Sequence, residues 1–285
     1  MAAGDLRSRS HDVNSVNTNV GAMVALQNLN STNAQLFEVQ NRINTGKRII
    51  SAKDNGAIWA IAQGQRATHS SLTTVKESLN RAQSTVDVAI SAGEAISDIL
   101  LQMKDKALAA SDTSLDTTAR SALSADFTAL RDQVTTVINN ADFNGVNLIK
   151  TGATALQALA NEKGSKITVG AQIMSYGGTI MTVTAAAALT SATVASTHVG
   201  ILSTSIANVS AALSKLGTGS KALGQHLNFV SKLQDTIEAG IGNLVDADLA
   251  KESARLQSLQ TKQQLGIQAL SIANSSSQTL LGLFR

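Results

Sequence analysis

Proline is absent from all 285 residues of the chain, whereas average usage of about 5% would give roughly a dozen. Because proline interrupts helices, its absence permits long continuous helices anywhere in the sequence. Cysteine is also absent, which excludes disulfides and thiolate metal sites. A chain of this composition can unfold and refold without redox chemistry.

Aromatic residues are scarce, at 2% of the chain, so the apolar 43% is mainly Ala, Val, Ile and Leu. These side chains fill narrow helix seams better than the wide core of a globular enzyme. The net charge of +3 arises from scattered basic and acidic residues, and few aromatics are present to stack on bases. We therefore expect no nucleic-acid binding.

Long apolar runs are missing as well. No stretch reaches the roughly 18 consecutive apolar residues that a membrane-spanning helix needs, so we expect no membrane insertion. Met1 to Asp12 is polar and is followed by no apolar signal-peptide core, which argues against Sec-type secretion. We expect Met1 to Val13 to be a disordered, dispensable N-terminal extension.

Heptad patterns are present at both ends of the chain. In the C-terminal series the a and d positions are Leu249, Leu256, Leu259, Gln263, Gly266, Leu270, Ala273, Ser277, Leu280 and Phe284. In the N-terminal series they are Leu29, Leu36, Val39, Ile43, Ile50 and Ala57. Polar and small residues weaken both seams, since they bury little apolar area. The two termini are thus predicted to pair with each other and to need neighbouring molecules for full burial.

The N-terminal series lies in a helix predicted to begin between Asn14 and Asn19 and to continue to about Thr45. Glu38 and Arg42 form an i,i+4 pair expected on its outer face. Residues 46–56 mix charge, Asn and Gly, which predicts a compact non-helical connector.

Longer series fill the rest of the chain. One from Ile58 predicts a helix of about 50 residues, and a turn at Ser111 to Thr118 predicts a shorter helix that folds back on it. A last series runs from Val199 to Leu244. Its register slips by one residue at 245–248, where carboxylates suit the N-terminus of a new helix.

The middle of the chain has a different character. Lys166 to Val169 and Thr179 to Val183 are β-type runs separated by a loop with Gly177 and Gly178, which predicts a β-hairpin. We expect 151–197 to hold this hairpin and an Ala/Ser/Thr-rich surface segment. Deletion of 185–196 should then leave assembly intact, and its Ser and Thr residues are candidate O-glycan acceptors.

The predicted fold is mainly α: an elongated antiparallel bundle of long coiled-coil helices with a small β-hairpin. Residues 14–56 and 245–285 are predicted to form an inner coiled coil of terminal helices. Residues 57–150 and 198–244 are predicted to form an outer helical bundle.

Candidate catalytic and ligand-binding patterns are weak. Gly217-Thr-Gly219-Ser-Lys221 lacks phosphate-loop spacing and a preceding strand, so it indicates a helix irregularity, and Gly240-Ile-Gly242 lacks the third glycine of a dinucleotide fingerprint. Asp246 and Asp248 point to different sides of a helix, so capping explains them better than paired acid and base. The four histidines stand alone in the sequence: His11, His69, His198 and His226. We predict no enzyme and no cofactor or metal site.

The chain resembles the bacterial flagellins, in particular the short flagellins of alphaproteobacteria such as Caulobacter. The resemblance covers roughly 14–183 and 199–285. The N-terminal matches are Val16-Asn-Thr-Asn19, Thr45-Gly-Lys-Arg-Ile-Ile-Ser-Ala-Lys-Asp54 and Phe143-Asn-Gly-Val146. The C-terminal matches are Val245-Asp-Ala-Asp248 with Ala250 and Glu252, Gln263-Gln-Leu-Gly266, Ala273-Asn274 and Leu281-Gly-Leu-Phe-Arg285.

The resemblance implies a subunit of the flagellar filament used for motility, located outside the cell, with the terminal helices lining an inner tube. It implies as partners further copies or other flagellins, an export chaperone on the C-terminal helix, the type III export apparatus, and hook-associated and cap proteins. We assign the assembly seam to Leu29, Leu36, Ile43, Ile50, Leu249, Leu256, Leu270, Leu280 and Phe284. We assign the connector to Gly46, Arg48, Ser51, Lys53 and Asp54.

Two alternative functions stay open. A hook-filament junction protein shares terminal heptads, although the closing Leu-Gly-Leu-Phe-Arg and the Ser-Ala-Lys-Asp connector favour flagellin. A soluble effector or enzyme exported by the same route would need catalytic residues in a sizeable insert, and 150–197 has neither the length nor the residues.

Overall fold

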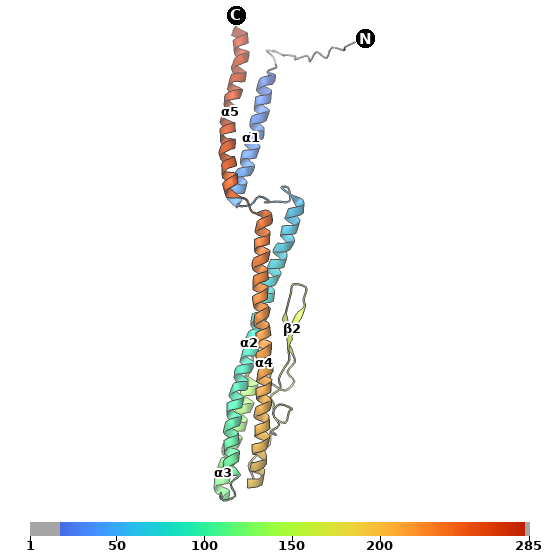
Figure 1. The fold of residues 1–285 in the computed structure, drawn as a ribbon, viewed down its shortest axis with the longest axis vertical. Coiled ribbons are helices and arrows are strands. Elements are labelled where there is room, and N and C mark those ends of the chain that lie inside the picture. Colours follow the sequence, from blue (N-terminus) through green and yellow to red (C-terminus); the bar gives the residue numbers. More distant parts are fainter. Residues whose placement is uncertain (1–17, 283–285) are drawn as a thin grey trace, which may run out of the picture. The chain divides into compact units, whose positions relative to one another are not determined.

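The computed structural model of the chain describes the backbone of residues 18–282 and the side chains of residues 18–275. This range holds five helices and two strands (Figure 1). In chain order they are α1 (Val20–Thr45), α2 (Gly56–Ala110), α3 (Thr117–Asn140), β1 (Leu156–Leu159), β2 (Lys166–Val169), α4 (Ala192–Val245) and α5 (Leu249–Gly282). The mainly helical fold with a small antiparallel hairpin agrees with the prediction. The predicted N-terminal extension lies outside the described residues.

The chain divides into two compact units. The terminal unit combines residues up to Gln65 with those from Ala239 onward, and the central unit is formed by 66–238. Each unit is described by itself below.

Capping residues fix the ends of the terminal helices. Asn19 Oδ1 accepts a hydrogen bond from Ala22 N at 2.9 Å, and Gly46 ends α1 in the left-handed conformation at φ 69°, which suits glycine. Asp248 Oδ1 accepts from the backbone N–H groups of Ala250 and Lys251 at 3.0 and 3.1 Å. The predicted breaks at Gly46 and at 245–248 are therefore confirmed, and Asp248 serves as an N-cap.

Long heptad seams form the core of the central unit, where α2, α3 and α4 lie side by side (Figure 1). Gln234 Nε2 donates to Thr73 Oγ1 at 3.1 Å and Gln83 Nε2 donates to Ser220 Oγ, so α2 and α4 run antiparallel. Seam residues buried from the three helices include Leu72, Leu79, Val86, Ile96, Met103, Phe127, Val134, Leu202, Val209, Leu216, Leu223 and Val230. The predicted long helix, 55 residues in α2, and the shorter helix that folds back are both confirmed.

The predicted hairpin has one strand right, Lys166–Val169, which is β2, and the other strand wrong. β2 pairs antiparallel with β1, Leu156 opposite Val169, instead of with Thr179–Val183. The turn at Asn161–Gly164 makes this pairing possible: Asn161 Oδ1 accepts from Ser165 N at 2.9 Å, and Gly164 adopts φ 83°.

The segment before α4 is also more than a surface element. Five of its apolar side chains are buried in the central core: Met174, Met181, Val183, Ala187 and Leu189. Polar contacts hold it against α3, since Tyr176 OH donates to Arg131 O at 2.8 Å and Leu189 N donates to Ser124 Oγ at 3.0 Å. α4 begins at Ala192, inside the segment expected to be dispensable. Deleting 185–196 would remove core residues.

The Gly217–Lys221 motif lies inside α4, which continues through it as a regular helix. A Cβ built on Gly219 would lie 2.8 Å from Val169 Cγ1, so the missing side chain lets β2 approach α4 closely. This glycine has a packing role, which corrects the predicted helix irregularity.

By length and composition alone, α4 could cross a membrane. Packing accounts for the apolar residues at its heptad positions, because Leu202, Val209, Leu216 and Leu223 are buried in the central core.

Candidate assembly surface

α1 and α5, the first and last helices of the chain, pack against each other in antiparallel orientation. We call this pair the α1–α5 hairpin, and three polar contacts lie along its length. Asn19 Nδ2 donates to Ala273 O at 2.7 Å, and Gln263 Nε2 donates to Asn33 Oδ1 at 2.8 Å. Arg42 Nη1 donates to Glu252 Oε1 at 3.3 Å. The helices lie side by side in Figure 1.

The seam of this hairpin is thin. Of its predicted apolar residues, Val39 and Leu259 are buried, while five are only half-buried: Leu29, Leu36, Ile43, Leu256 and Leu270. Gly266 permits a close approach, since a Cβ built there would lie 3.3 Å from Leu29 Cδ1. The pairing therefore leaves apolar area on both helices uncovered.

Some predicted seam residues are not brought together. Ile50 is exposed because it lies in the connector beyond the end of α1, and Leu249 is exposed at the first position of α5. The side chain of Leu280 and the whole of Phe284 lie outside the described residues.

An ion-pair cluster in the hairpin escaped the sequence reasoning. Arg42 pairs with Glu38 on its own helix and with Glu252 on α5, so it does not lie on an outer face as expected. Glu252 is the one buried charged residue among those that the structure describes. The Glu38–Arg42 spacing is visible in the sequence, but the partner on the other helix, 210 residues away, has no local signal.

Hydrogen bonds hold the connector, residues 46–56, against the junction between α4 and α5. Arg48 N donates to Val245 O at 2.7 Å, Ala247 N donates to Gly46 O at 2.9 Å, and the Arg48 side chain donates to Leu244 O at 2.9 Å. Below these bonds, Ile49 and Val245 are buried in a small cluster with Ala62.

Asp54 shapes the second half of the connector. Its Oδ2 accepts hydrogen bonds from Ile50 N at 2.9 Å and Ser51 N at 2.8 Å, and these bonds lower the pKa of the carboxyl below its ordinary value. Lys53 N donates to Ser51 Oγ at 3.3 Å, while the Lys53 side chain is exposed. Each connector residue assigned from the sequence thus lies in one hydrogen-bonded loop, in which Gly46 supplies the positive φ.

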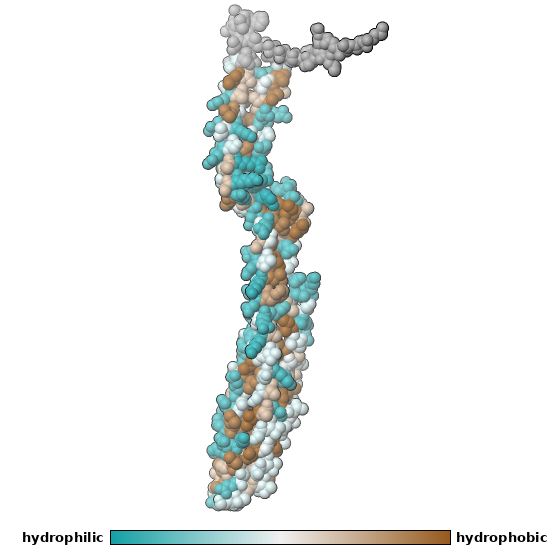
Figure 2. All heavy atoms as spheres, viewed as in Figure 1, coloured by the Kyte–Doolittle hydropathy of each residue, from teal (hydrophilic) through white to brown (hydrophobic). Residues whose placement is uncertain are grey.

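The hairpin is charged at one end only. Residues 18–37 and 263–282 contain no Asp, Glu, Lys, Arg or His, and antiparallel pairing places these two segments together. Figure 2 shows hydrophobic atoms towards the ends of α1 and α5 that lie away from the connector, and hydrophilic atoms nearer to it. The exposed large apolar residues of the charge-free segments are Val20, Met23, Val24, Leu26, Phe37, Leu265, Ile267 and Ile272. They lie on more than one side of the two helices, and together we call these eight residues the apolar face.

The apolar face is unusual for this molecule. Of the sixteen large apolar side chains exposed in the described residues, eleven belong to the terminal unit and five to the central unit, although the central unit is the longer one. Exposed apolar side chains concentrated in one part of a molecule mark surfaces that other molecules cover.

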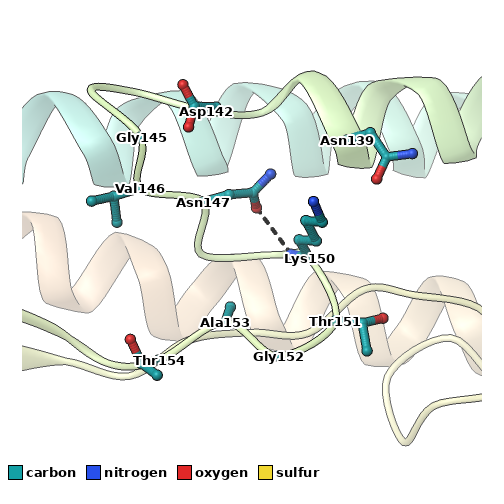
Figure 3. Close-up of a pocket in the computed structure, with 10 residues that line it drawn as sticks. All are labelled: Asn139, Asp142, Gly145, Val146, Asn147, Lys150, Thr151, Gly152, Ala153 and Thr154. Carbon is teal, nitrogen blue, oxygen red and sulfur yellow. Dashed lines mark hydrogen bonds between the residues drawn. The ribbon is translucent and has the colours of Figure 1, made fainter.

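A polar hollow of about 340 Å³ in the central unit has no such character (Figure 3). Its loop is held by Asn147, which donates to Ile138 O at 2.7 Å and accepts from Ile149 N and Lys150 N at 2.9 Å each. These bonds build the loop, and they leave Asn147 with a structural role.

The histidines are separated in the described structure. His226 Nε2 lies 2.7 Å from Ala160 O at the β-hairpin, and the His198 ring lies 5.9 Å from that of Phe127. His69 accepts from Gln234 only through its backbone carbonyl, and His11 lies outside the described range. Within residues 18–282, no three His, Asp or Glu side chains are grouped to hold a metal ion.

Comparison with known proteins agrees with this architecture. Residues 16–154 match the family described as bacterial flagellin N-terminal helical region, and residues 199–284 match the bacterial flagellin C-terminal helical region. Flagellin FljM of Caulobacter vibrioides is 58% identical over 273 residues, which cover 96% of this chain and 99% of that protein. A flagellin of Brucella melitensis is 37% identical over 281 residues, covering 95% and 99%.

A solved structure described as a putative flagellar hook-associated protein from Vibrio parahaemolyticus has a similar fold, with a TM-score of 0.57. It is 14% identical and covers 68% of this chain and 100% of that one, so the likeness concerns the fold alone. The two family regions, by contrast, take in both terminal helices and most of the central unit. The chain belongs to the bacterial flagellin family.

Proposed function

We propose that the α1–α5 hairpin is the surface through which this flagellin, a structural subunit of the bacterial flagellar filament, polymerises. The observation that carries the proposal is the apolar face on a charge-free end of the hairpin. Occupants of the face would be the hairpins of neighbouring copies, or of other flagellins in a mixed filament.

The energetics favour such packing. A fully buried Leu, Ile or Val contributes about 1.5 to 3 kcal/mol, and the half-buried seam residues realise only part of this. Contacts between copies would recover the remainder, and the lack of charge in 18–37 and 263–282 means that burial would strand no ionised group. The hairpin has the properties of half an interface.

The same face bears on export. A secreted, extracellular filament subunit would have to reach the cell exterior without aggregating, and exposed Leu265, Ile267 and Ile272 on α5 would need cover beforehand. We propose that an export chaperone covers this part of α5 until the chain enters a type III export apparatus. Hook-associated and cap proteins would contact the same hairpin at the filament ends.

Sedimentation tests the proposal. After salting-out, wild-type chain should pellet, whereas Ile272→Asp should remain in the supernatant because it places a carboxylate on the apolar face. Phe229→Asp is the matched control, since Phe229 is 56% exposed in the central unit and Ile272 is 70% exposed in the terminal unit. If Ile272→Asp pellets like wild type, or if both variants fail alike, assembly is not governed by the hairpin.

A further inference from the structure

One methionine differs sharply from the others in its access to solvent. Met23 is 63% exposed on the apolar face, whereas Met103, Met174 and Met181 are fully buried in the central core. The chain has five methionines, and the fifth, Met1, lies outside the described residues. The same thioether is therefore present in one accessible and three inaccessible places.

We propose that Met23 is an oxidation-sensitive modification site whose state decides whether the soluble chain can assemble. The modifying class of reagent is a peroxide. The inference rests on the proposed assembly surface, because the modification acts by changing a residue of the apolar face.

The reaction is a transfer of one oxygen atom. The thioether sulfur attacks a peroxide oxygen, the O–O bond breaks, an S–O bond forms, and hydrogen peroxide leaves as water. The sulfur loses two electrons and the peroxide gains them, so that no further reactant is needed. The product, methionine sulfoxide, is polar and accepts hydrogen bonds where the thioether was apolar.

The surroundings make this change costly for assembly. Val20, Val24 and Leu26 flank Met23 on α1 as exposed apolar residues, and no Lys, Arg or His lies in 18–37 or 263–282 to pair with the new oxygen. Burying a sulfoxide against a second apolar face would leave its oxygen poorly satisfied. In the soluble hairpin the same oxygen faces water, so the modified chain still folds.

Access also sets the order of events. Met23 is open in the soluble chain and would be covered once neighbouring copies pack on the apolar face. Oxidation therefore acts before assembly and is suppressed afterwards.

Hydrogen peroxide treatment of the full soluble chain, followed by peptide mass mapping, tests the first step. Met23 should be converted at least about ten times faster than the three buried methionines. Oxidised chain should then need a roughly tenfold higher concentration to pellet after salting-out. Met23→Leu should pellet normally before and after peroxide, and Met23→Gln should assemble poorly without any oxidant.

The contrary outcomes separate the two proposals. Three outcomes would overturn the oxidation switch and leave the assembly surface untouched. They are equal oxidation of Met23 and the three buried methionines, normal assembly of oxidised chain, and loss of assembly in peroxide-treated Met23→Leu. Oxidation of Met23 in pelleted polymer as fast as in soluble chain would instead show that the face stays open, which contradicts the assembly surface itself.

Discussion

The two units of this chain use the same heptad pattern to different ends. In the central unit the seam residues of α2, α3 and α4 are buried, with Phe127, Leu202 and Leu216 completely covered. In the terminal unit most of the corresponding residues of α1 and α5 stay half-buried, and large apolar side chains face outward. A third helix and the segment before α4 complete the first core, while the described residues of the terminal unit supply no third helix to cover α1 and α5. The difference teaches that a heptad repeat specifies a helix and one face, whereas completeness of burial depends on how many partners the chain supplies.

The largest expected effect is on assembly. Leu270→Asp or Ile43→Asp should abolish pelleting after salting-out, because each places a carboxylate in the thin seam of the hairpin. Unfolding of the central unit, measured by circular dichroism, should stay unchanged. Gln260→Asp, at an exposed position in the charged half of α5, is the control that should pellet normally.

Protease protection sharpens the same comparison. Polymer should protect α1 and α5 where soluble chain does not, since packing against neighbours adds the missing burial. Soluble hairpins that already resist protease, or charged variants that pellet like wild type, would remove the distinction between the two units.

Core truncation should show the opposite pattern. Phe127→Ala is expected to destabilise the central unit by about 3 to 5 kcal/mol, because the fully buried ring leaves a cavity. The half-buried Leu36 should cost less on truncation to Ala in the soluble chain. Urea unfolding of both variants measures this, and an equal loss of stability would mean that the hairpin seam is as complete as the central core.

A smaller effect is expected at the contact between β2 and α4. Gly219→Ala should cost about 1 to 3 kcal/mol, because the new methyl would lie 2.8 Å from Val169 Cγ1. Gly217→Ala is matched to it in the same helix, has nothing within 4 Å of its built Cβ, and should gain about 0.5 to 1 kcal/mol in helix propensity. Thermal unfolding of both variants tests this, and equal changes in Tm for Gly219→Ala and Gly217→Ala would contradict the close approach of β2 to α4.

The smallest effect concerns pH. Burial lowers the pKa of His198 below its ordinary value of 6.5, so below that pH the unfolded chain binds the proton more readily than the folded one. The neutral His198 side chain therefore favours the folded state fully above pH 6.5, and this contribution to the free energy of unfolding is lost as the pH falls towards the lowered pKa. Wild type should therefore lose slightly more stability than His198→Gln between pH 7.5 and 5.5.

The carboxylates act in another pH range. Hydrogen bonds lower the pKa of Asp54 and Asp112 below 3.8, so the contributions of these carboxylates to stability are lost only in stronger acid.

Thermal unfolding of wild type and His198→Gln between pH 7.5 and 5.5 measures the histidine effect. The same dependence of Tm on pH in both proteins would remove His198 as the cause.

Sequence periodicity predicted the helices well, because a heptad is a local signal that covers many residues. It predicted the terminal seam through Leu29, Leu36 and Leu256, and the break at 245–248 through the slip in register. It failed for the segment from Met174 to Leu189, whose apolar residues have no period and are buried by contacts with helices that are distant in the sequence, as Met174 is beside Gly93 of α2.

Long-range choices were beyond local signals. β2 is followed by a turn at Gly177 and preceded by one at Gly164, and either turn could have joined it to a partner strand. In the observed pairing with β1, Val169 of β2 also packs on Gly219 of α4. The Arg42–Glu252 ion pair was missed because long charged side chains usually stay in water. The charge-free ends of α1 and α5 could have been found in the sequence by scanning for missing ionisable residues on both helices.

The backbone hydrogen bonds between the connector and the junction of α4 and α5 have a mechanical consequence. Gly46, Arg48 and Ile49 are hydrogen-bonded to Val245, the last residue of α4, and to Ala247 in the link to α5, so the end of α1 is held beside the residues that lead into α5. A force applied to α1 is transmitted through these hydrogen bonds to the residues that lead into α5, because the connector cannot extend freely while they are intact. Bending the α1–α5 hairpin at this end must break several hydrogen bonds together. We therefore expect this end to resist bending and to give way in one step once the hydrogen bonds break.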